Sequence, residues 1–555
     1  MTPGTAPVLI VGSGPAGLTA AILLADLGVP AVLVERNPGT TDHPRAHVIN
    51  TRTMEIFRGI GIADGVHAAG LAPEAYERIL WKRTIAGEEL GALTMDLDRA
   101  AGRAAASPTR IASCAQDRVE ELLRAAAERR GCDLRYGVEV VGYVQDDDGV
   151  TVALRTAGGE TTLRARYVIA ADGASSPTRR LLDVAMQGIP PLATLVGIYF
   201  EADLARWAGD RPGLLYFLMN SAAPGIVIAL DGRTRWIYHR LQFEDRLEPE
   251  AAAAAVRLAV GVPDLDVTIK SIRPWTMTAE VAERFRVGSV FLAGDAAHRF
   301  PPTGGFGLNT GVQDVHDLAW KLARVLDGTA PATLLDSYER ERRPVAQSNT
   351  DWSVRNFLEG GSAVGPGNLM ATAQIEAGGP DVPAVLAQLQ RDIDAERDHF
   401  DALGQDLGFV YEEGALVPDG SALPVVADRA AEYVPNARPG SRAPHCWLRR
   451  GAERISILDL FGRAFVLLVP EGARAWIAAA AERDGDGFRC VRIGPRGDYD
   501  DEDGAWRELY GVGPEGAVLV RPDGHVAWRM HAGPVGEAEA TRRLADVLAT
   551  VLAGG

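Results

Sequence analysis

Three glycines near the N-terminus have the spacing of a phosphate-binding turn. Gly12, Gly14 and Gly17 follow an apolar run at residues 8–11 and open a helical segment at residues 16–26. In such a turn the first glycine allows the sharp bend, and the second lets the backbone approach a pyrophosphate. The third lets the helix lie close to the strand, while the helix N-terminus faces the phosphate charge. The pattern predicts a dinucleotide site; the alternative is a glycine-rich turn that binds nothing.

An acidic residue follows at the distance that such a site requires. Glu35 ends a second apolar run at residues 31–34, where a carboxylate can accept hydrogen bonds from a ribose diol. The order strand, glycine turn, helix, strand and acid is more specific than a glycine triplet alone, and it favours the dinucleotide interpretation.

Two further apolar runs each deliver an aspartate next to a glycine. Asp172-Gly173 follows the run at residues 163–171, and Gly294-Asp295 follows the run at residues 287–292. Ligands of open α/β sheets lie at the carboxyl ends of the strands, which is where both pairs fall. A glycine-rich loop at residues 301–311 then leads into a long helix over residues 309–326, whose N-terminus would face the pyrimidine end of a flavin ring. The alternative for each pair alone is a plain strand-to-helix loop with a capping aspartate.

Taken together, these motifs resemble those of the single-component, FAD-dependent aromatic hydroxylases, the group of para-hydroxybenzoate and phenol hydroxylases. The resemblance covers about residues 6–360 and is strongest in GSGPAG at 12–17 and GDAAHRFPPTGGFGLNTG at 294–311. The segment at residues 44–55 is similar to the chlorophenol-hydroxylase and polyketide-hydroxylase branch.

The resemblance implies one FAD and a transiently bound NADPH or NADH. The residues it assigns to the cofactor are Gly12, Gly14, Ala16, Gly17, Glu35, Arg36, Arg45, Gln116, Asp172, Gly173, Asp295, Gly305, Gly307, Leu308 and Asn309. No metal-ligand spacing is present, and we expect no metal.

The chemistry implied by the family is hydroxylation of a phenolic or polyketide-derived ring by O2, through a flavin C4a-hydroperoxide. The protein must exclude water, place the ring and favour phenolate character. The candidates for this last role are His47, Tyr216, Tyr238, His239 and Arg240, of which we favour His47 as catalytic and keep Tyr216. Pro301 is a candidate for stiffening the loop beside the reaction centre. Baeyer–Villiger oxygenation of a ketone on the same fold, or a flavin-binding module without turnover, are the alternatives.

We expect an α/β FAD-binding Rossmann-like domain, an antiparallel β-sheet substrate domain and a C-terminal thioredoxin-like α/β domain. The expected FAD-binding domain is discontinuous, and the thioredoxin-like domain, which lacks C-x-x-C, follows from the family resemblance. The predicted boundaries are 1–185 with 282–360 for the FAD-binding domain, 186–281 with part of 70–110 for the substrate domain, 361–429 for a linker or helical segment, and 430–555 for the C-terminal domain.

Composition narrows the class of protein. The 555 residues are too many for a single core, and the net charge of −17 argues against nucleic acid as a partner. The four cysteines are scattered, which fits a reducing compartment. No run of about 18 apolar residues is present to span a bilayer. We therefore expect a cytoplasmic protein with no membrane partner, a small phenolic substrate, and a homo-oligomer, with a dimer as the family-level guess.

Several residues are expected to have only structural roles. His298 is predicted to be a packed loop histidine, Trp275 and Trp320 to be core residues, and Asp314 and Asp317 to be exposed or capping. We also predict a linker over residues 360–382 and a strand at residues 455–459.

Overall fold

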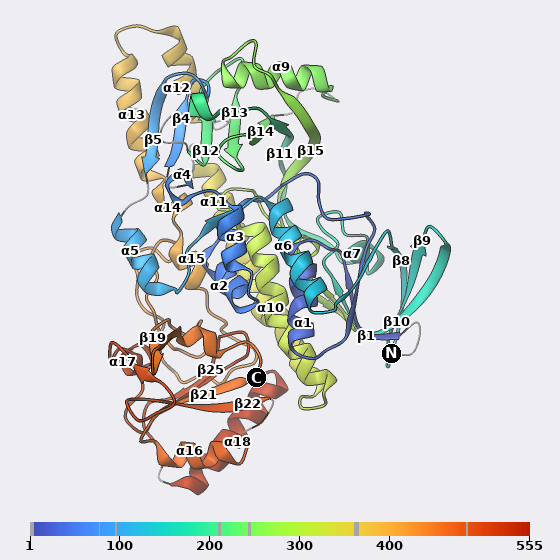
Figure 1. Ribbon diagram of the computed structural model, residues 1–555, viewed down its shortest axis with the longest axis vertical. Helices are drawn as coiled ribbons and strands as arrows, with labels where there is room; N and C mark the ends of the chain where they lie inside the picture. The colour runs from blue at the N-terminus through green and yellow to red at the C-terminus, as the bar shows by residue number, and fades with distance from the viewer. Residues whose placement is uncertain are drawn as a thin grey trace.

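The computed structural model describes residues 5–76, 78–94, 97–208, 213–241, 246–359, 366–483, 485, 487–534 and 536–555. Three parts follow one another down the long axis in Figure 1: a broad sheet with α9 at one end, a helix-covered sheet in the middle, and the C-terminal part at the other end. Part of the predicted linker, residues 360–365, lies outside the described residues. The rest of that linker is not irregular, because helix α12 (Pro366–Ala377) occupies it and α13 (Val382–Ala395) follows.

The middle part is built on a sheet with strand order β16-β17-β10-β1-β2-β7. Strands β1, β2, β7, β10 and β17 are parallel. Apolar runs suit these strands because both faces of a parallel sheet are buried. The bounds are β1 (Thr5–Val11), β2 (Ala31–Glu35), β7 (Asp133–Tyr136), β10 (Gly159–Ala170), β16 (Arg286–Val287) and β17 (Val290–Leu292), with β8 (Glu139–Asp146) and β9 (Gly149–Thr156) joined to β10 as an antiparallel extension.

Helices cover this sheet and follow its strands. Helix α1 (Pro15–Asp26) leaves β1 and packs against α10 (Phe306–Leu326) and α6 (Gln116–Arg129). Because β1 lies between β2 and β10, and β10 lies next to β17, the chain turns that follow β1, β10 and β17 meet at one edge of the sheet. The remaining elements of this part are β3 (Val48–Ile49), α2 (Thr51–Gly59), α3 (Ala63–Ala69), α5 (Leu97–Ala106), β6 (Ala112–Ser113), α7 (Pro177–Leu181), η1 (Gly294–Ala296), η2 (Ala332–Asp336) and α11 (Ser337–Glu359).

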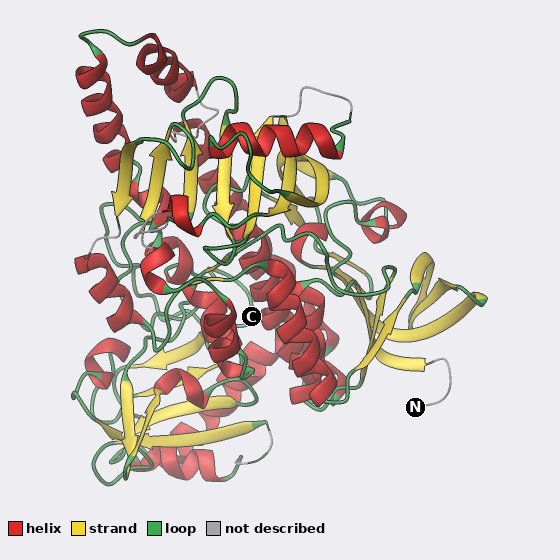
Figure 2. Cartoon of the chain, turned by 45° about the horizontal axis from the view of Figure 1, so that its top comes forward, coloured by secondary structure: helices red, strands yellow, loops and turns green. Residues whose placement is uncertain are grey.

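A second sheet, with order β18-β15-β11-β14-β13-β12-β4-β5, lies across the carboxyl edge of the first (Figure 2). Its strands are β4 (Arg78–Lys82), β5 (Glu89–Thr94), β11 (Met186–Glu201), β12 (Leu215–Leu218), β13 (Gly225–Ala229), β14 (Arg235–Leu241), β15 (Thr268–Ala282) and β18 (His298–Arg299). The expectation of a purely antiparallel sheet was wrong at one place, since β4 pairs parallel with β12. The reason is that β4 comes from an earlier part of the chain, so no hairpin turn fixes its direction against β12. Helix α9 (Pro249–Val260) packs its buried side on one face of this sheet.

The C-terminal part contains a four-stranded sheet with order β22-β21-β24-β25. Strands β21 (Phe465–Pro470) and β22 (Phe488–Ile493) are parallel and joined through α16 (Arg474–Ala481). Strands β24 (Ala517–Val520) and β25 (Val526–Met530) are antiparallel, and α18 (Glu537–Ala553) follows them. The C-terminal part also contains β19 (Trp447–Arg450), β20 (Glu453–Ser456), η3 (Ile457–Leu460), β23 (Asp500–Asp501) and α17 (Trp506–Tyr510). The short helices α4 (Pro73–Tyr76), α8 (Ala205–Ala208), α14 (Arg397–Phe400) and α15 (Leu403–Leu407) lie earlier in the chain.

The strand predicted at residues 455–459 ends early. The Ser456 hydroxyl accepts from the Leu458 amide, and the Asp459 carboxylate accepts from the Ser456 amide at 2.9 Å. This reciprocal capping starts the 3-10 turn η3 and stops β20 at Ser456.

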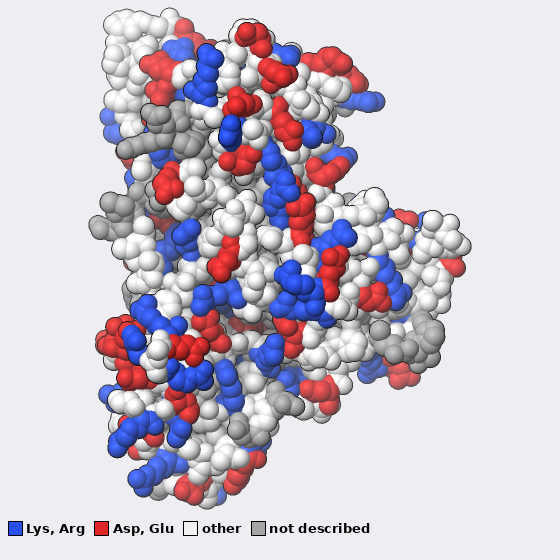
Figure 3. All heavy atoms as spheres, in the orientation of Figure 1, with Lys and Arg blue, Asp and Glu red and all other residues white. Residues whose placement is uncertain are grey.

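The distribution of surface charge and the absence of a long apolar helix among the described residues agree with the composition. Acidic and basic side chains are interspersed over all three parts on the face in Figure 3, which has no broad basic patch among the described residues. Within the described ranges, no helix is both long enough and apolar enough to cross a membrane.

Candidate active site

One cavity of about 1470 Å³ separates the carboxyl edge of the first sheet from the second sheet. Its wall on one side contains the turns after β1, β10 and β17, and on the other side residues of β11 to β15. Drug-sized ligands usually fill about 300–1,000 Å³. This cavity therefore has room for a dinucleotide together with a second, smaller molecule.

Two glycines, Gly12 and Gly17, shape the turn after β1, because backbone atoms occupy the space that a side chain would need there. A Cβ on Gly12, whose φ is +103°, would lie 2.3 Å from the Ala171 carbonyl oxygen, and one on Gly17 would lie 1.9 Å from the Gly12 carbonyl oxygen. At Gly14, which lines the cavity as the N-cap of α1, a Cβ would meet nothing within 4 Å. No side chain caps α1 and its first turn carries no acid, so its amides face the cavity in the manner of an anion site.

Glu35 lies at the edge of this turn with its carboxylate held by the backbone. Its Oε2 accepts from the Ser13 amide at 3.0 Å, and its Oε1 accepts from the Asn37 amide at 2.8 Å. Arg36 and Arg45 line the same region, and Gln116 accepts from the Ala46 amide at 3.2 Å. These groups surround the end of the cavity that the ADP half of a dinucleotide would take.

The turn after β10 carries Asp172 and Gly173, both of which line the cavity. The Asp172 carboxylate accepts from the Ser176 hydroxyl and from the Thr178 amide, the latter at 2.9 Å. Asp172 therefore supports the N-terminus of the short helix α7, whose N-cap is Ser176, while it lines the cavity.

The turn after β17 and the following loop complete the wall that contains the turns after β1 and β10. Asp295, Pro301, Gly305, Gly307 and Leu308 all line the cavity. Gly305 has a φ of +69° and is the N-cap of α10, which again has neither a side-chain cap nor an acid in its first turn. The second uncapped helix terminus thus points at the same cavity as the first.

Asn309 does not line the cavity; instead it fixes the loop. Its Oδ1 accepts from the Asn50 amide at 3.0 Å, and its Nδ2 donates to the carbonyls of Val48 and Gly305, at 3.0 and 2.6 Å. Gly17 likewise lies beneath the cavity lining. Of the predicted cofactor residues, these two support the site from behind, while Gly12, Gly14, Ala16, Glu35, Arg36, Arg45, Gln116, Asp172, Gly173, Asp295, Gly305, Gly307 and Leu308 line it.

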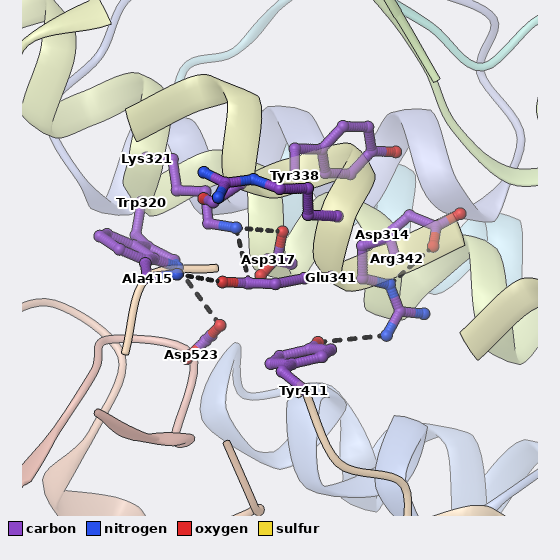
Figure 4. A network of polar contacts seen from close by, with 12 residues as sticks. Asp314, Asp317, Trp320, Lys321, Tyr338, Glu341, Arg342, Tyr411, Ala415 and Asp523 are labelled. Carbon is purple, nitrogen blue, oxygen red and sulfur yellow. Dashed lines mark hydrogen bonds and ion pairs between the residues drawn. The ribbon is translucent and has the colours of Figure 1, made fainter. Parts of the chain in front are cut away.

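Asp314 and Asp317 were expected to be exposed or to act as local caps, and the expectation of exposure was wrong. Both are buried on α10 (Figure 4). Asp314 accepts from the Gly294 amide at 3.1 Å, lies 2.7 Å from His298 Nε2, and accepts from Arg342 Nε at 2.9 Å. Burial works to raise the Asp314 pKa, but the charges of His298 and Arg342 outweigh it and lower the pKa below its ordinary value. Asp314 thus holds the turn at Gly294 directly behind Asp295.

Asp317 belongs to a second buried cluster between α10, α11 and the C-terminal part. Lys321 and Arg521 lie among the three carboxylates of Asp317, Glu341 and Asp523. Figure 4 labels Lys321 and the three acids. All five side chains are at most 1% exposed. Trp320, a core residue as predicted, donates its indole N–H to Asp523 at 3.3 Å.

The register of the second sheet decides which predicted substrate-side residues reach the cavity. Tyr216 pairs across the sheet with Val227 and, beyond it, Tyr238. Side chains of directly paired residues lie on the same face, and this row packs in the core beneath α9. Tyr216 accepts from the Gly213 amide at 2.9 Å and Tyr238 donates to the Pro224 carbonyl at 3.0 Å. Tyr216, Tyr238 and Arg240 do not line the cavity.

The neighbouring row faces the cavity, and it places the predicted candidate His239 beside residues that the sequence did not single out. His239 pairs with Ile226, which pairs with Phe217, and all three line the cavity. His43 and Trp275 line it as well, so Trp275 is half-buried at the cavity wall instead of in the core. The alternation of side chains along β14 could have separated His239 from Tyr238, but the sequence alone did not give the direction of the cavity.

His47 and Pro301 stand where the two walls meet. His47 Nδ1 lies 3.4 Å from the Ser113 hydroxyl, and burial lowers the pKa of the His47 imidazole to about 4. The ring is therefore neutral at neutral pH and can accept a hydrogen bond. Pro301 is buried in the loop between β18 and α10, on the wall that contains the turns.

Comparison with known proteins agrees with this geometry. Residues 5–353 match the FAD binding domain family, and residues 436–554 match the family described as aromatic-ring hydroxylase, C-terminal. The chain belongs to the FAD-dependent aromatic-ring hydroxylases.

Relatives and solved structures extend over nearly the whole chain. A putative polyketide hydroxylase of Streptomyces halstedii is 39% identical over 99% of this chain and 97% of its own. The 2,4-dichlorophenol 6-monooxygenase of Cupriavidus pinatubonensis is 34% identical over 95% and 93%. The crystal structure of the flavin-dependent monooxygenase PieE with FAD and substrate has a TM-score of 0.89 and 38% identity, covering 99% of both chains. The resemblance to single-component flavin hydroxylases is thereby confirmed, as are FAD as the cofactor and a monooxygenase as the class of enzyme.

Proposed function

We propose that this enzyme uses NADPH or NADH and O2 to hydroxylate a phenolic or polyketide-derived aromatic ring. The observation that carries the proposal is a cavity with three turns that follow strands on one wall, an apolar wall with the neutral imidazole of His239 opposite, and the neutral imidazole of His47 between them. The relatives named as polyketide hydroxylase and dichlorophenol monooxygenase support this substrate class.

The residues of the cavity fit FAD. The two uncapped helix N-termini and the open side of Gly14 suit the pyrophosphate and the ring, and Glu35 suits a ribose diol. We propose that FAD is bound by Gly12, Gly14, Ala16, Glu35, Arg36, Arg45, Gln116, Asp172, Gly173, Asp295, Gly305, Gly307 and Leu308, with Gly17 and Asn309 supporting the turns from behind. When bound and reduced by the nicotinamide, FAD supplies the chemistry with O2.

The protein's own contribution is to place the ring, exclude water and hold the phenol hydroxyl. The apolar wall of Leu195, Leu215, Ile226 and Ile228 keeps water from the reacting ring. His47 accepts a hydrogen bond from the phenol hydroxyl, which increases the electron density of the ring. Pro301 keeps the adjacent loop in place. Tyr216 has no part in this proposal, because its side chain lies on the other face of the sheet.

We propose a thioredoxin-like C-terminal domain that has a structural role. The support is the order β22-β21-β24-β25 with α16 between the parallel strands and α18 at the end. Cys446 and Cys490 are not joined in a disulfide and do not have C-x-x-C spacing, which argues against thiol catalysis. A homo-oligomer stays a prediction, as do the boundaries of the domains.

The proposal is tested with purified, FAD-loaded enzyme and a panel of phenols and hydroxylated polycyclic aromatics. We expect at least one of them to accelerate NAD(P)H oxidation and to gain one oxygen atom from 18O2, detected by mass spectrometry. Oxygen insertion next to a ketone would instead support Baeyer–Villiger chemistry. A yellow enzyme that no aromatic compound stimulates would contradict the proposal.

A further inference from the structure

Two histidines lie against one glycine on the substrate side of the cavity. Gly197 on the central strand β11 pairs with His239 on β14 and with Arg273 on β15. A Cβ on Gly197 would lie 3.1 Å from His239 Cε1 and 3.3 Å from His43 Nε2. Glycine weakens a strand interior. The φ of Gly197 lies outside the range from +20° to +160°, so the backbone conformation does not require glycine here. What this glycine provides is the space into which both imidazoles project.

Trp275 fixes which nitrogen of His239 carries the proton. The indole N–H of Trp275, which can only donate, points at His239 Nδ1 over a long 3.4 Å. The two rings meet edge to face, with centroids 5.7 Å apart. Nδ1 is therefore the acceptor, and the proton of the neutral ring lies on Nε2. His239 consequently presents an N–H donor on a ring that lines the cavity.

Both imidazoles remain neutral under working conditions. Burial lowers the pKa of His239 to about 3, and the nearby His43 and His47 add to the effect. Burial, with Arg45 and Arg273, lowers the pKa of His43 to about 4. His43 Nδ1 is also engaged, at 2.7 Å from the Ser271 hydroxyl. A neutral donor surrounded by apolar wall suits an oxygen acceptor on an otherwise apolar molecule.

We infer that His239, with its tautomer set by Trp275, forms with His43 a polar subsite that hydrogen-bonds a carbonyl or phenolate oxygen of the aromatic substrate. Gly197 gives both imidazoles the space that they occupy, which brings the two rings together at one side of the cavity. The inference rests on the proposed function and deepens it by naming where an oxygen of the aromatic ring is bound, at this sheet and away from the cofactor turns. His239 would act as a donor and not as a base, because its free nitrogen already carries the proton.

The test compares two aromatic probes of nearly equal size on the FAD-loaded enzyme. 1-Tetralone offers a carbonyl acceptor and no donor, whereas naphthalene offers neither. Binding is followed by the change in the flavin absorbance spectrum. We expect His239→Phe to raise the Kd of 1-tetralone about tenfold, because a buried acceptor loses its donor. The Kd of naphthalene should change less than twofold.

A second variant and two controls distinguish a loss of substrate binding from a loss of folding. Gly197→Ala should weaken 1-tetralone more than naphthalene, because the new methyl group pushes against both imidazoles. Gly142→Ala, at a position of β8 that does not line the cavity, and His531→Phe, on the exposed surface of the C-terminal part, should leave both Kd values unchanged. In 15N NMR of the histidine-labelled enzyme, the resonance lost in His239→Phe should report a proton on Nε2.

The outcomes separate this inference from the proposed function. Equal changes for both probes in His239→Phe, or a proton on Nδ1 of His239, would overturn the inference while leaving the hydroxylase proposal intact. If the unmodified enzyme bound neither probe and no phenol accelerated NAD(P)H oxidation, the proposed function would be wrong, and this inference would fall with it.

Discussion

Arg521 of the C-terminal part and Glu341 of α11 form a bidentate ion pair. Arg521 Nη1 donates to Glu341 Oε1 at 2.8 Å, and Nη2 donates to Oε2 at 2.9 Å, with both side chains fully buried. Asp317 accepts from the same guanidinium at 2.9 Å. Residues 180 positions apart thus join the C-terminal part to the helix pair behind the cavity.

Removing one partner of this pair should destabilise the protein strongly. Arg521→Met leaves the carboxylates of Asp317, Glu341 and Asp523 with only Lys321 among them. Breaking a buried ion pair from one side typically costs about 3–5 kcal/mol, because the other charge stays buried. The measurement is the urea dependence of unfolding, followed by tryptophan fluorescence. The control is Arg543→Met, whose exposed pair with Glu539 should contribute at most about 1 kcal/mol. Equal midpoints for the two variants would contradict the prediction.

The three carboxylates of this cluster should not behave alike. Burial and the charge of Glu341 raise the Asp317 pKa well above its ordinary value, whereas Arg521 and Lys321 overcome burial and lower the Glu341 pKa. Three acids and two cations then balance if Asp317 holds a proton. We expect Asp317→Asn to cost about 1 kcal/mol and Glu341→Gln about 3 kcal/mol or more. The readout is the free energy of unfolding at pH 7, and the reverse order would show that Asp317 is ionised.

Asp314 should control how tightly FAD is held although it does not line the cavity. It fixes the Gly294 amide and is itself held by His298 and Arg342. Asp314→Asn removes the charge and turns one acceptor into a donor, so the turn at Asp295 should loosen. We expect the Kd of FAD to rise about tenfold, equivalent to about 1.4 kcal/mol, measured by flavin fluorescence on titration of the apoprotein. Asp327→Asn, an exposed site just beyond the end of the same helix, is the matched control. An unchanged Kd would assign Asp314 to stability alone.

The cofactor turns were predictable because their signal is local. A side chain on Gly12 or Gly17 would collide with backbone that lies a few residues away or at the end of the adjacent strand. The spacing of the glycines in the sequence is therefore enough to predict the turn. Asp314 and Asp317 could not be placed in this way. Their partners Arg342 and Arg521 lie 28 and 204 residues further along the chain, and only the folded structure buries them together.

The substrate side was predictable only in part, because the two faces of a strand differ by one residue. Tyr238 and His239 are neighbours in the chain, yet one packs under α9 and the other lines the cavity. A residue type that suits catalysis says nothing about which face is covered by a helix. His47 could be chosen from the family motif, whereas Tyr216 required the register to be known.

The glycine turn gives a prediction that separates folding from binding. Gly14 has an ordinary φ of −68°, and a Cβ there would meet no protein atom within 4 Å, so Gly14→Ala should fold normally. The methyl group would project where a pyrophosphate must approach. We expect at least a tenfold weaker Kd for FAD with an unchanged unfolding midpoint of the apoprotein. Gly102→Ala, in the open on α5, should retain FAD and gain up to about 1 kcal/mol in stability. Gly14→Ala that binds FAD normally would place the phosphates elsewhere.

Acid should weaken the junction with the C-terminal part through His525. Burial lowers its pKa to about 4, against the opposing effect of Asp523, whereas the unfolded chain takes up the proton near 6.5. Between these values the unfolded state binds more protons, so stability falls as the pH drops, by about 1.4 kcal/mol per pH unit. From pH 7 to pH 5 the native protein should therefore lose about 2 kcal/mol more than His525→Phe, in which this group is absent. His531→Phe, at an exposed site of the same part, should lose as much as the native protein. Parallel pH profiles for the native protein and His525→Phe would mean that the buried imidazole is already protonated in the fold.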